Sequence, residues 1–195
     1  MRGVLQQQTL ARPAGFSGIG LHSGNKVSMT LLPAPPNTGV VFRRVDLDSR
    51  AEIPAQVANV AETDRSTTLS RGNAKVQTVE HVLAALYGFG VTNAVVELDS
   101  SEPPVGDGSA WPFCKMIREA DIETQAERVE PIEITAPIEH TQDGTVMSAT
   151  PHDGFKITCT SSDKGGRFTQ LFSVELTPET WESEIAQART FCFYE

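Results

Sequence analysis

One stretch decides how the first half of this chain folds: Gln77-Thr78-Val79-Glu80-His81-Val82-Leu83-Ala84-Ala85-Leu86. Its larger apolar residues recur at positions i, i+3, i+4 and i+7, the spacing of a helix packed on a core: Val79, Val82, Leu83 and Leu86. Thr78 stands where an N-cap belongs, and Gly88 or Gly90 can end the helix in a left-handed conformation. We therefore predict a short core-packed helix.

The Glu80-His81 pair lies off this apolar stripe, because successive helical residues are rotated by about 100°. The partial positive charge at the helix N-terminus favours an ionised Glu80 and a neutral His81. A neutral imidazole can bind a metal, and a neighbouring carboxylate can take a proton from metal-bound water. In the alternative interpretation, Glu80 only complements the helix dipole and His81 is an ordinary surface or core residue. The pair alone leaves both open.

Composition narrows the class of protein. The 195 residues are enough for one large domain or two small ones, and a net charge of -9 argues against a general nucleic-acid binder. No apolar run approaches the about 20 residues that cross a bilayer, and we expect no signal peptide. The three cysteines, Cys114, Cys159 and Cys192, are typical of reduced core residues in a cytoplasmic protein.

Periodicity and turn residues predict strands on both sides of a polar segment. The expected strands are 26–32, 40–43, 65–69, 75–76, 93–98, 132–134, 145–149, 155–159 and 169–176. One further helix, capped by Ser109, should run to Ala120, and another, capped by Thr177 with Pro178 at its first position, should continue to Ala188.

The polar segment 122–131 is the expected boundary between a first α+β domain, residues 1–126, and a second, residues 127–195. The second half begins like the first and then stops. Its final run, Arg189-Thr190-Phe191-Cys192-Phe193-Tyr194-Glu195, is rich in aromatic residues, which predicts a chain cut short within its second domain.

Four motifs occur together in a fixed order: Gly18-Ile19-Gly20-Leu21-His22-Ser23-Gly24, Thr78-Val79-Glu80-His81, Glu102-Pro103-Pro104-Val105-Gly106-Asp107-Gly108-Ser109-Ala110 and Ala188-Arg189-Thr190-Phe191. Together they closely resemble the zinc-dependent UDP-3-O-acyl-N-acetylglucosamine deacetylases of lipid A synthesis in Gram-negative bacteria. The resemblance runs in register from Gln8 to Phe193.

This resemblance implies an α+β fold of two similar two-layer sheet-on-helix domains, ribosomal protein S5 domain 2-like, with the active site between them and the second domain incomplete. It also implies a reaction, the hydrolysis of the 2-acetamido group of a UDP-linked, 3-O-acylated glucosamine with release of acetate. We expect a cytoplasmic monomer that binds neither nucleic acid nor, stably, a membrane.

The resemblance also implies roles for single residues. His81 would be a ligand of zinc, or of iron(II), and Glu80 the general base. Thr190 would donate its hydroxyl to the developing oxyanion. His22 matches a histidine near that site, but it could equally hold only the backbone of its glycine-rich turn. Asp107-Gly108-Ser109 is expected to be architectural, an Asx-type turn that leads into a helix cap.

Two features depart from the family pattern. The family's other two zinc ligands and its general-acid histidine follow the Arg-Thr-Phe motif, and the remaining histidines here, His140 and His152, are expected on the surface. The family places an aromatic residue and a His-Pro near the nucleotide, where this chain has Ser161-Ser162-Asp163-Lys164-Gly165-Gly166-Arg167. We therefore expect this polypeptide to bind zinc weakly and to turn over poorly or not at all.

Two rival interpretations stay open. One is a non-catalytic module of the same fold that binds a sugar nucleotide or an acyl chain. The other is a structural or assembly protein in which the motifs are only turns and caps, since the fold alone does not decide function. The Glu80 carboxylate beside a candidate ligand histidine argues against the binding module, and the acidic charge balance argues against an RNA-assembly role.

Overall fold

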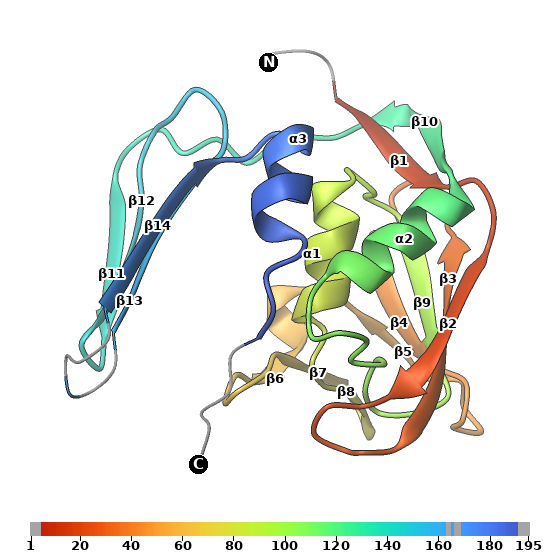
Figure 1. Ribbon diagram of the computed structural model, residues 1–195. Coiled ribbons are helices and arrows are strands. Elements are labelled where there is room, and N and C mark those ends of the chain that lie inside the picture. Colours follow the sequence, from red (N-terminus) through yellow and green to blue (C-terminus); the bar gives the residue numbers. More distant parts are fainter. Residues whose placement is uncertain (1–4, 163–164, 166–168, 191–195) are drawn as a thin grey trace.

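The computed structural model describes residues 5–162, 165 and 169–190. Its largest unit is a five-stranded sheet with the order β2-β3-β9-β4-β5 (Figure 1). The strands are β2 (Ala14–Ile19), β3 (Lys26–Pro33), β4 (Val40–Arg44), β5 (Glu52–Pro54) and β9 (Ala94–Leu98). Only the central pair β4 and β9 is parallel. The chain must therefore cross over between these two strands, and this crossover carries the Glu80-His81 helix.

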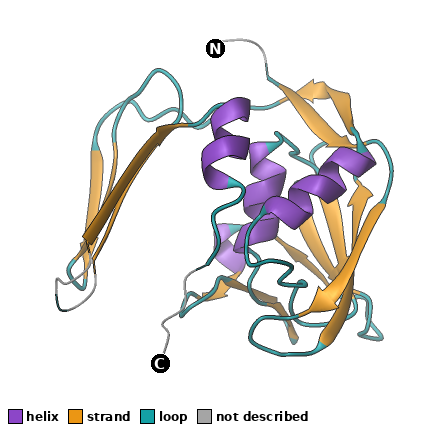
Figure 2. Ribbon diagram, viewed as in Figure 1, coloured by secondary structure: helices purple, strands orange, loops and turns teal. Residues whose placement is uncertain are grey.

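Alternation of apolar and polar residues builds the buried face of this sheet. Val27, Met29 and Leu31 of β3 are buried, and the residues between them are not. Phe42 of β4 and Ile53 of β5 continue the same apolar surface. Two helices, α1 (Glu80–Gly88) and α2 (Trp111–Ala120), cover this face (Figure 2).

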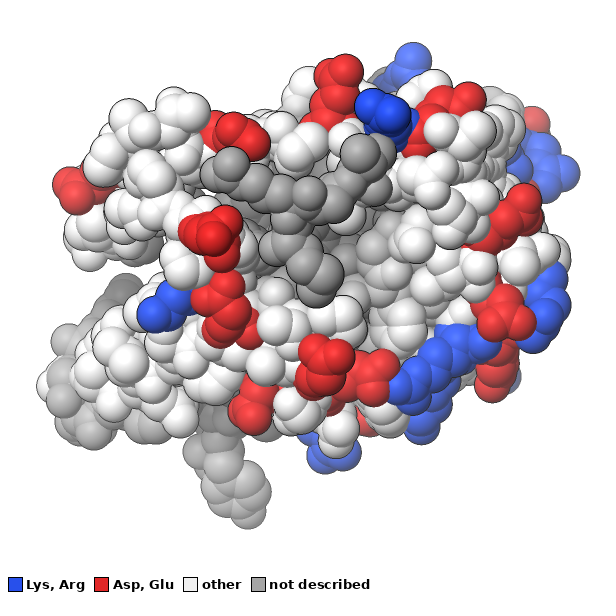
Figure 3. Space-filling model, turned by 90° about the horizontal axis from the view of Figure 1, so that it is seen from above, with Lys and Arg blue, Asp and Glu red and all other residues white. Residues whose placement is uncertain are grey.

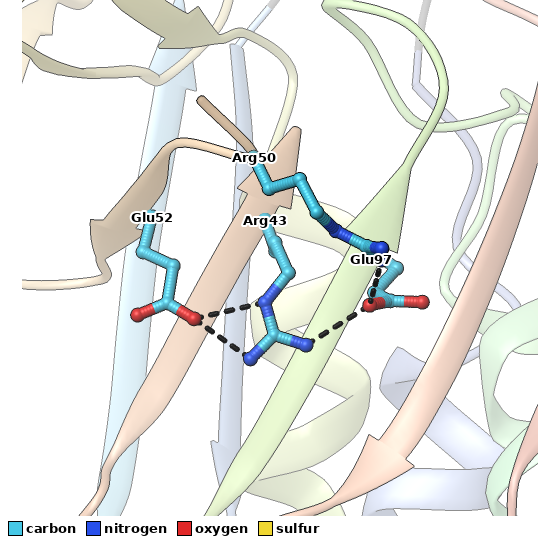
Figure 4. A network of polar contacts seen from close by, with 4 residues as sticks. All are labelled: Arg43, Arg50, Glu52 and Glu97. Atoms are coloured by element: carbon cyan, nitrogen blue, oxygen red, sulfur yellow. Dashed lines mark hydrogen bonds and ion pairs between the residues drawn. The ribbon is translucent and has the colours of Figure 1, made fainter. Parts of the chain in front are cut away.

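The other face of the sheet is polar. Arg43 of β4 bonds Glu52 on β5 and Glu97 on β9, and Arg50 reaches the same Glu97 carboxylate at 3.3 Å (Figure 4). The hydrogen bonds that Arg43 donates to Glu97 and Glu52 raise the pKa of its guanidinium. Helices on one face and charged side chains on the other make this unit two-layered, which confirms the predicted α+β class.

Two smaller sheets frame the main one. The first contains β6 (Val60–Glu62), β7 (Thr68–Arg71) and β8 (Ala74–Val76), follows a 3-10 turn at Val57–Asn59 and leads directly into α1. The second pairs β1 (Gln6–Leu10) with β10 (Ile122–Arg128). The polar segment 122–131, expected at the domain boundary, therefore contains a strand, β10, that periodicity did not predict. The predicted domain boundary after residue 126 remains a prediction.

The C-terminal part begins with two hairpins, β11 (Ile138–Gln142) with β12 (Thr145–Ala149) and β13 (Lys156–Ser162) with β14 (Thr169–Glu175). They project away from the five-stranded sheet in Figure 1. The predicted strand at residues 132–134 is absent, because that segment forms no ladder. Whether this second part is incomplete remains a prediction.

A final helical segment returns the chain to α1. Thr177 forms the predicted cap, with Pro178 in the first turn of α3 (Pro178–Thr180), and a π-helical turn continues through Trp181–Ile185. The helix ends there, short of the predicted Ala188.

Trp181 fixes this segment to the first half of the molecule. Its side chain is buried and lies so close to Gly88 of α1 that a Cβ at Gly88 would overlap the indole ring. Arg118 of α2 forms an ion pair with the neighbouring Glu182. The C-terminal helical segment is therefore part of the same core as α1 and α2.

The cysteines differ from the prediction in part. Cys114 is a buried core residue, and its burial raises the pKa of the thiol to about 11. Cys159 is exposed on its hairpin, so its predicted core position is wrong. Cys192 lies outside the described residues.

The surface carries charges of both signs. Acidic and basic side chains lie interspersed on the face shown in Figure 3. Within the described part of the chain, no helix has both the length and the apolar character needed to span a membrane.

Candidate functional site

The turn into α1 differs from the predicted cap. Val79 occupies the N-cap position, and no side chain caps the helix there. Thr78 instead has a φ of 58°, a left-handed conformation that a β-branched residue rarely adopts. Its hydroxyl donates to Oε1 of Glu102 at 2.8 Å. The prediction of Thr78 as N-cap is therefore wrong, because its side chain is committed to a distant carboxylate.

The other end of α1 agrees with the sequence. Gly90 has a φ of 71°, its N–H donates to the carbonyl of Tyr87, and the N–H of Val91 donates to the carbonyl of Leu86. This pair of bonds is a Schellman motif, which satisfies the last carbonyls of the helix. Gly90 is thus the predicted left-handed stop.

The backbone of Thr67 positions Glu80. The Thr67 N–H donates to Oε2 of Glu80 at 2.9 Å, and the Thr67 carbonyl accepts the N–H of Val79 at 3.3 Å. The strand entering β7 therefore holds the first turn of α1 at two points. Oε1 of Glu80 has no hydrogen-bond partner among the described residues, so half of this carboxylate is free to meet a ligand.

His81 is half-buried, and its imidazole makes no hydrogen bond or ion pair with any described residue. A partly accessible imidazole with a free ring nitrogen suits a metal ligand. Within the described ranges, no group of three or more His, Cys, Asp or Glu side chains could hold a metal ion. The described residues therefore fit one position of a metal site and do not complete it.

Glu102 is the residue that the sequence interpretation missed. It is 0 % exposed, and its carboxylate accepts hydrogen bonds from the backbone N–H groups of His22 at 3.1 Å and Ser23 at 2.9 Å, as well as from Thr78. Burial raises the pKa of Glu102, but the hydrogen bonds from Ser23, His22 and Thr78 outweigh it and lower the pKa overall. In the sequence, Glu102 is marked only by the two prolines that follow it. Its hydrogen-bond partners are distant along the chain, so the sequence does not predict them.

His22 has a backbone role in this arrangement. It lies in the turn between β2 and β3, where its N–H binds Glu102 and its side chain is exposed. Its imidazole has no hydrogen-bond partner in the described part of the chain. The backbone of His22 thus ties this turn to Glu102, whereas both expected roles of its side chain, structural and catalytic, remain predictions.

The loop after Glu102 contains the predicted Asx turn. Oδ1 of Asp107 accepts the N–H of Ser109 at 3.1 Å and its hydroxyl at 2.6 Å. The Ser109 hydroxyl oxygen accepts the N–H of Trp111, the first residue of α2, at 3.1 Å. The hydrogen bond from the Ser109 hydroxyl lowers the pKa of Asp107. The expected Asx turn at Asp107-Gly108-Ser109 is therefore confirmed. The prediction of Ser109 as the cap of this helix is wrong, because Ala110 occupies the N-cap position and no side chain caps it there.

Thr190 reaches the same loop from the C-terminal segment. Its N–H donates to the carbonyl of Gly108 at 2.8 Å, and the neighbouring Arg189 lies 4.0 Å from the Asp107 carboxylate. The hydroxyl of Thr190 has no hydrogen-bond partner among the described residues.

The loop from Glu102 to Ser109 thus contacts three segments that carry predicted site residues. It binds the turn of His22, the side chain of Thr78 just before the Glu80-His81 helix, and the backbone of Thr190. Among the described residues, no hydrogen bond or ion pair joins the side chains of His22, Glu80, His81 and Thr190 to one another.

The remaining predicted positions lie away from this loop. His140 and His152 are exposed, as expected, and Nε2 of His152 lies 2.8 Å from Oε2 of Glu175. Of the segment 161–167, which departs from the family pattern at the nucleotide, residues 163, 164, 166 and 167 lie outside the described residues.

Comparison with known proteins agrees with the motifs. The family UDP-3-O-acyl N-acetylglycosamine deacetylase (LpxC) matches residues 7–195. A UDP-3-O-acyl-N-acetylglucosamine deacetylase from Pseudomonas entomophila (strain L48) is 44% identical over 97% of this chain. The chain spans 64% of the length of that relative. The chain therefore belongs to the UDP-3-O-acyl N-acetylglycosamine deacetylase family.

Proposed function

We propose that this chain carries part of the active site of a metal-dependent deacetylase. Its substrate would be UDP-3-O-acyl-N-acetylglucosamine, and hydrolysis of the 2-acetamido group would release acetate in the committed step of lipid A biosynthesis. One observation carries the proposal. The Glu102–Ser109 loop and Thr67 hold the segments that carry His22, Glu80, His81 and Thr190. The two imidazoles, Oε1 of Glu80 and the hydroxyl of Thr190 have no hydrogen-bond partner among the described residues.

Glu80 would act as the general base. The Thr67 N–H binds Oε2 and fixes the orientation of the carboxylate, which leaves Oε1 to accept a proton from the attacking water. A base held at one oxygen and free at the other needs no reorientation before proton transfer.

His81 would supply one ligand to zinc, or to iron(II), which a His/His/Asp donor set also accepts. Bound metal would supply Lewis-acid chemistry at the amide carbonyl. A catalytic zinc commonly has three protein ligands, and the described residues offer no such group. We therefore expect weak metal binding by these residues alone.

Thr190 would stabilise the oxyanion. Its backbone is anchored to Gly108 and its hydroxyl is free, so the hydroxyl can donate to an oxygen that becomes negative only in the transition state. The side chain of His22 would lie near the same oxyanion. A cytoplasmic location and a monomeric state remain predictions.

The test is acetate release from UDP-3-O-acyl-N-acetylglucosamine under single-turnover conditions, with the protein in excess and zinc present. Loss of a general base lowers the rate by about 10²–10⁴-fold, so Glu80→Gln should lose at least about 100-fold while its substrate affinity is kept. Glu119→Gln, an exposed change on α2, is the matched control and should behave as the wild type.

Equal acetate release by wild type and Glu80→Gln would contradict the role of Glu80. Substrate binding by the wild-type chain that does not respond to zinc and is unchanged in His81→Ala would favour the alternative, a non-catalytic module for a sugar nucleotide or an acyl chain.

A further inference from the structure

We propose that Glu102 is a positioning residue, which fixes the Glu80-His81 helix relative to the turn of His22. The inference rests on the proposed function for the roles of these residues. Its structural content concerns one buried carboxylate and the two segments that it joins.

The chemistry of Glu102 favours a positioning role over simple packing. The side chain is 0 % exposed and forms no ion pair with any described residue. Its oxygens accept hydrogen bonds only from neutral donors: Thr78 Oγ1 at 2.8 Å, Ser23 N at 2.9 Å, His22 N at 3.1 Å and Gln77 Nε2 at 3.5 Å. Burying a carboxylate is costly, and a well-packed apolar side chain would stabilise this space as well or better. Unlike an apolar side chain, the carboxylate orients the segments around it, because each of its oxygens binds particular donor groups.

Thr78 connects Glu102 to the helix. Its φ of 58° is a strained conformation for a threonine, which persists only where the surroundings hold it. The hydrogen bond to Oε1 of Glu102 provides that hold. Because Glu80 and His81 follow at once in the first turn of α1, the conformation of Thr78 sets the direction in which their side chains leave the backbone.

The turn of His22 is fitted closely around the same carboxylate. A Cβ at Gly20 would overlap Oε2 of Glu102 and the hydroxyl of Ser23, so the turn approaches the carboxylate more closely than a larger residue would allow. Oε1 accepts from both Thr78 and His22. A change at Glu102 should therefore displace His22 and His81 together.

The experiment records the imidazole ¹H–¹³C NMR signals of the metal-free 195-residue chain, with no substrate. The sequence has only four histidines, and single His→Gln variants assign them. His140 and His152 are exposed, lie on or beside the C-terminal hairpins and serve as internal controls. Glu102→Gln keeps the shape of the side chain but presents an amide N–H₂ to donors that need an acceptor.

In Glu102→Gln, the signals of His22 and His81 should both move by more than those of His140 and His152. A matched pair at Thr78 tests the same link without changing Glu102. Glycine adopts a left-handed φ without strain, so Thr78→Gly should leave His81 near its wild-type position, whereas Thr78→Ala should move it. If Glu102→Gln does not fold, the two Thr78 variants still test whether the conformation of Thr78 sets the position of His81.

Signals of His22 and His81 that move no more than the controls would overturn the proposal, as would equal effects of Thr78→Gly and Thr78→Ala. The readout needs neither metal nor turnover. Coupled shifts in a chain whose Glu80→Gln variant releases as much acetate as the wild type would therefore support the positioning role and count against the proposed function alone.

Discussion

Replacement of Trp181 by alanine tests how the segment that carries Thr190 is held in place. Trp181 is 5 % exposed, and its ring packs directly over Gly88 of α1. The contacts between Thr190 and the Glu102–Ser109 loop follow on the same segment. Without the indole ring, this segment should separate from α1 and carry Thr190 away from the loop.

The expected cost follows from the burial of the ring. A Trp→Ala change in a core costs about 3–5 kcal/mol, a large part of the about 5–15 kcal/mol that stabilises a typical domain. A segment at the edge of a core can also open locally, and then the loss is capped by the free energy of that opening. We therefore expect Trp181→Ala to lose about 3 kcal/mol, or to expose the C-terminal helix while β3 and β9 stay protected.

Urea unfolding followed by circular dichroism measures the first outcome, and amide hydrogen exchange measures the second. The informative amides are those of Trp181 and Ala186, which donate to Thr177 and Trp181 at 2.8 Å. Glu184→Ala, an exposed change in the same helix, is the control and should stay within about 0.5 kcal/mol of wild type. A loss below about 1 kcal/mol with unchanged protection of both amides would refute this account of how the segment is held.

Three further predictions concern the loop and the helix ends. The pKa of Glu102 is lowered in the folded state, so its carboxylate stabilises the fold above the ordinary pKa of 4.5, and this stabilisation is lost as the pH falls through the folded pKa. The difference in unfolding free energy between wild type and Glu102→Gln, measured in urea, should therefore shrink between about pH 6 and pH 3. A difference that stays constant over this range would contradict the prediction. Ser109→Ala leaves the N–H of Trp111 without its partner and should lower the free energy of unfolding in urea by about 1–3 kcal/mol. A loss below about 0.5 kcal/mol would count against a stabilising role of this hydrogen bond. Gly90→Ala should lower the midpoint of thermal unfolding, because the left-handed φ of 71° at this position destabilises an alanine by about 1 kcal/mol relative to glycine. An unchanged midpoint would argue against the Schellman motif.

Local chemistry made several elements predictable from the sequence. The alternation from Lys26 to Leu32 indicated β3, the β-branched run before Leu98 indicated β9, and Thr177 with Pro178 marked the start of the last helix. In each case the signal lies within a few residues, because one buried face or one cap determines the conformation.

The failures have non-local causes. Residues 122–128 are mostly polar and mostly exposed, and they form β10 because β1, far away in the sequence, offers them a partner strand. Thr78 looked like a cap, but Glu102 takes its hydroxyl and holds it left-handed. No residue near Glu102 in the sequence reveals that its donors come from two distant segments.

The same distinction applies to the candidate site. The motifs indicated His22, Glu80, His81 and Thr190, and the structure adds the loop that contacts the backbone around three of them. The roles of the four side chains in catalysis remain proposals.

The most direct test of the central claim, that the Glu80-His81 helix is part of a metal-dependent hydrolytic site, is a zinc titration. Bound zinc per chain and the imidazole NMR signals would be followed together, for the wild type and for His81→Ala. We predict that zinc changes the His81 signals before those of His140 and His152, and that His81→Ala loses this binding. Equal zinc binding by the His81→Ala variant, or a response confined to His140 and His152, would contradict the claim.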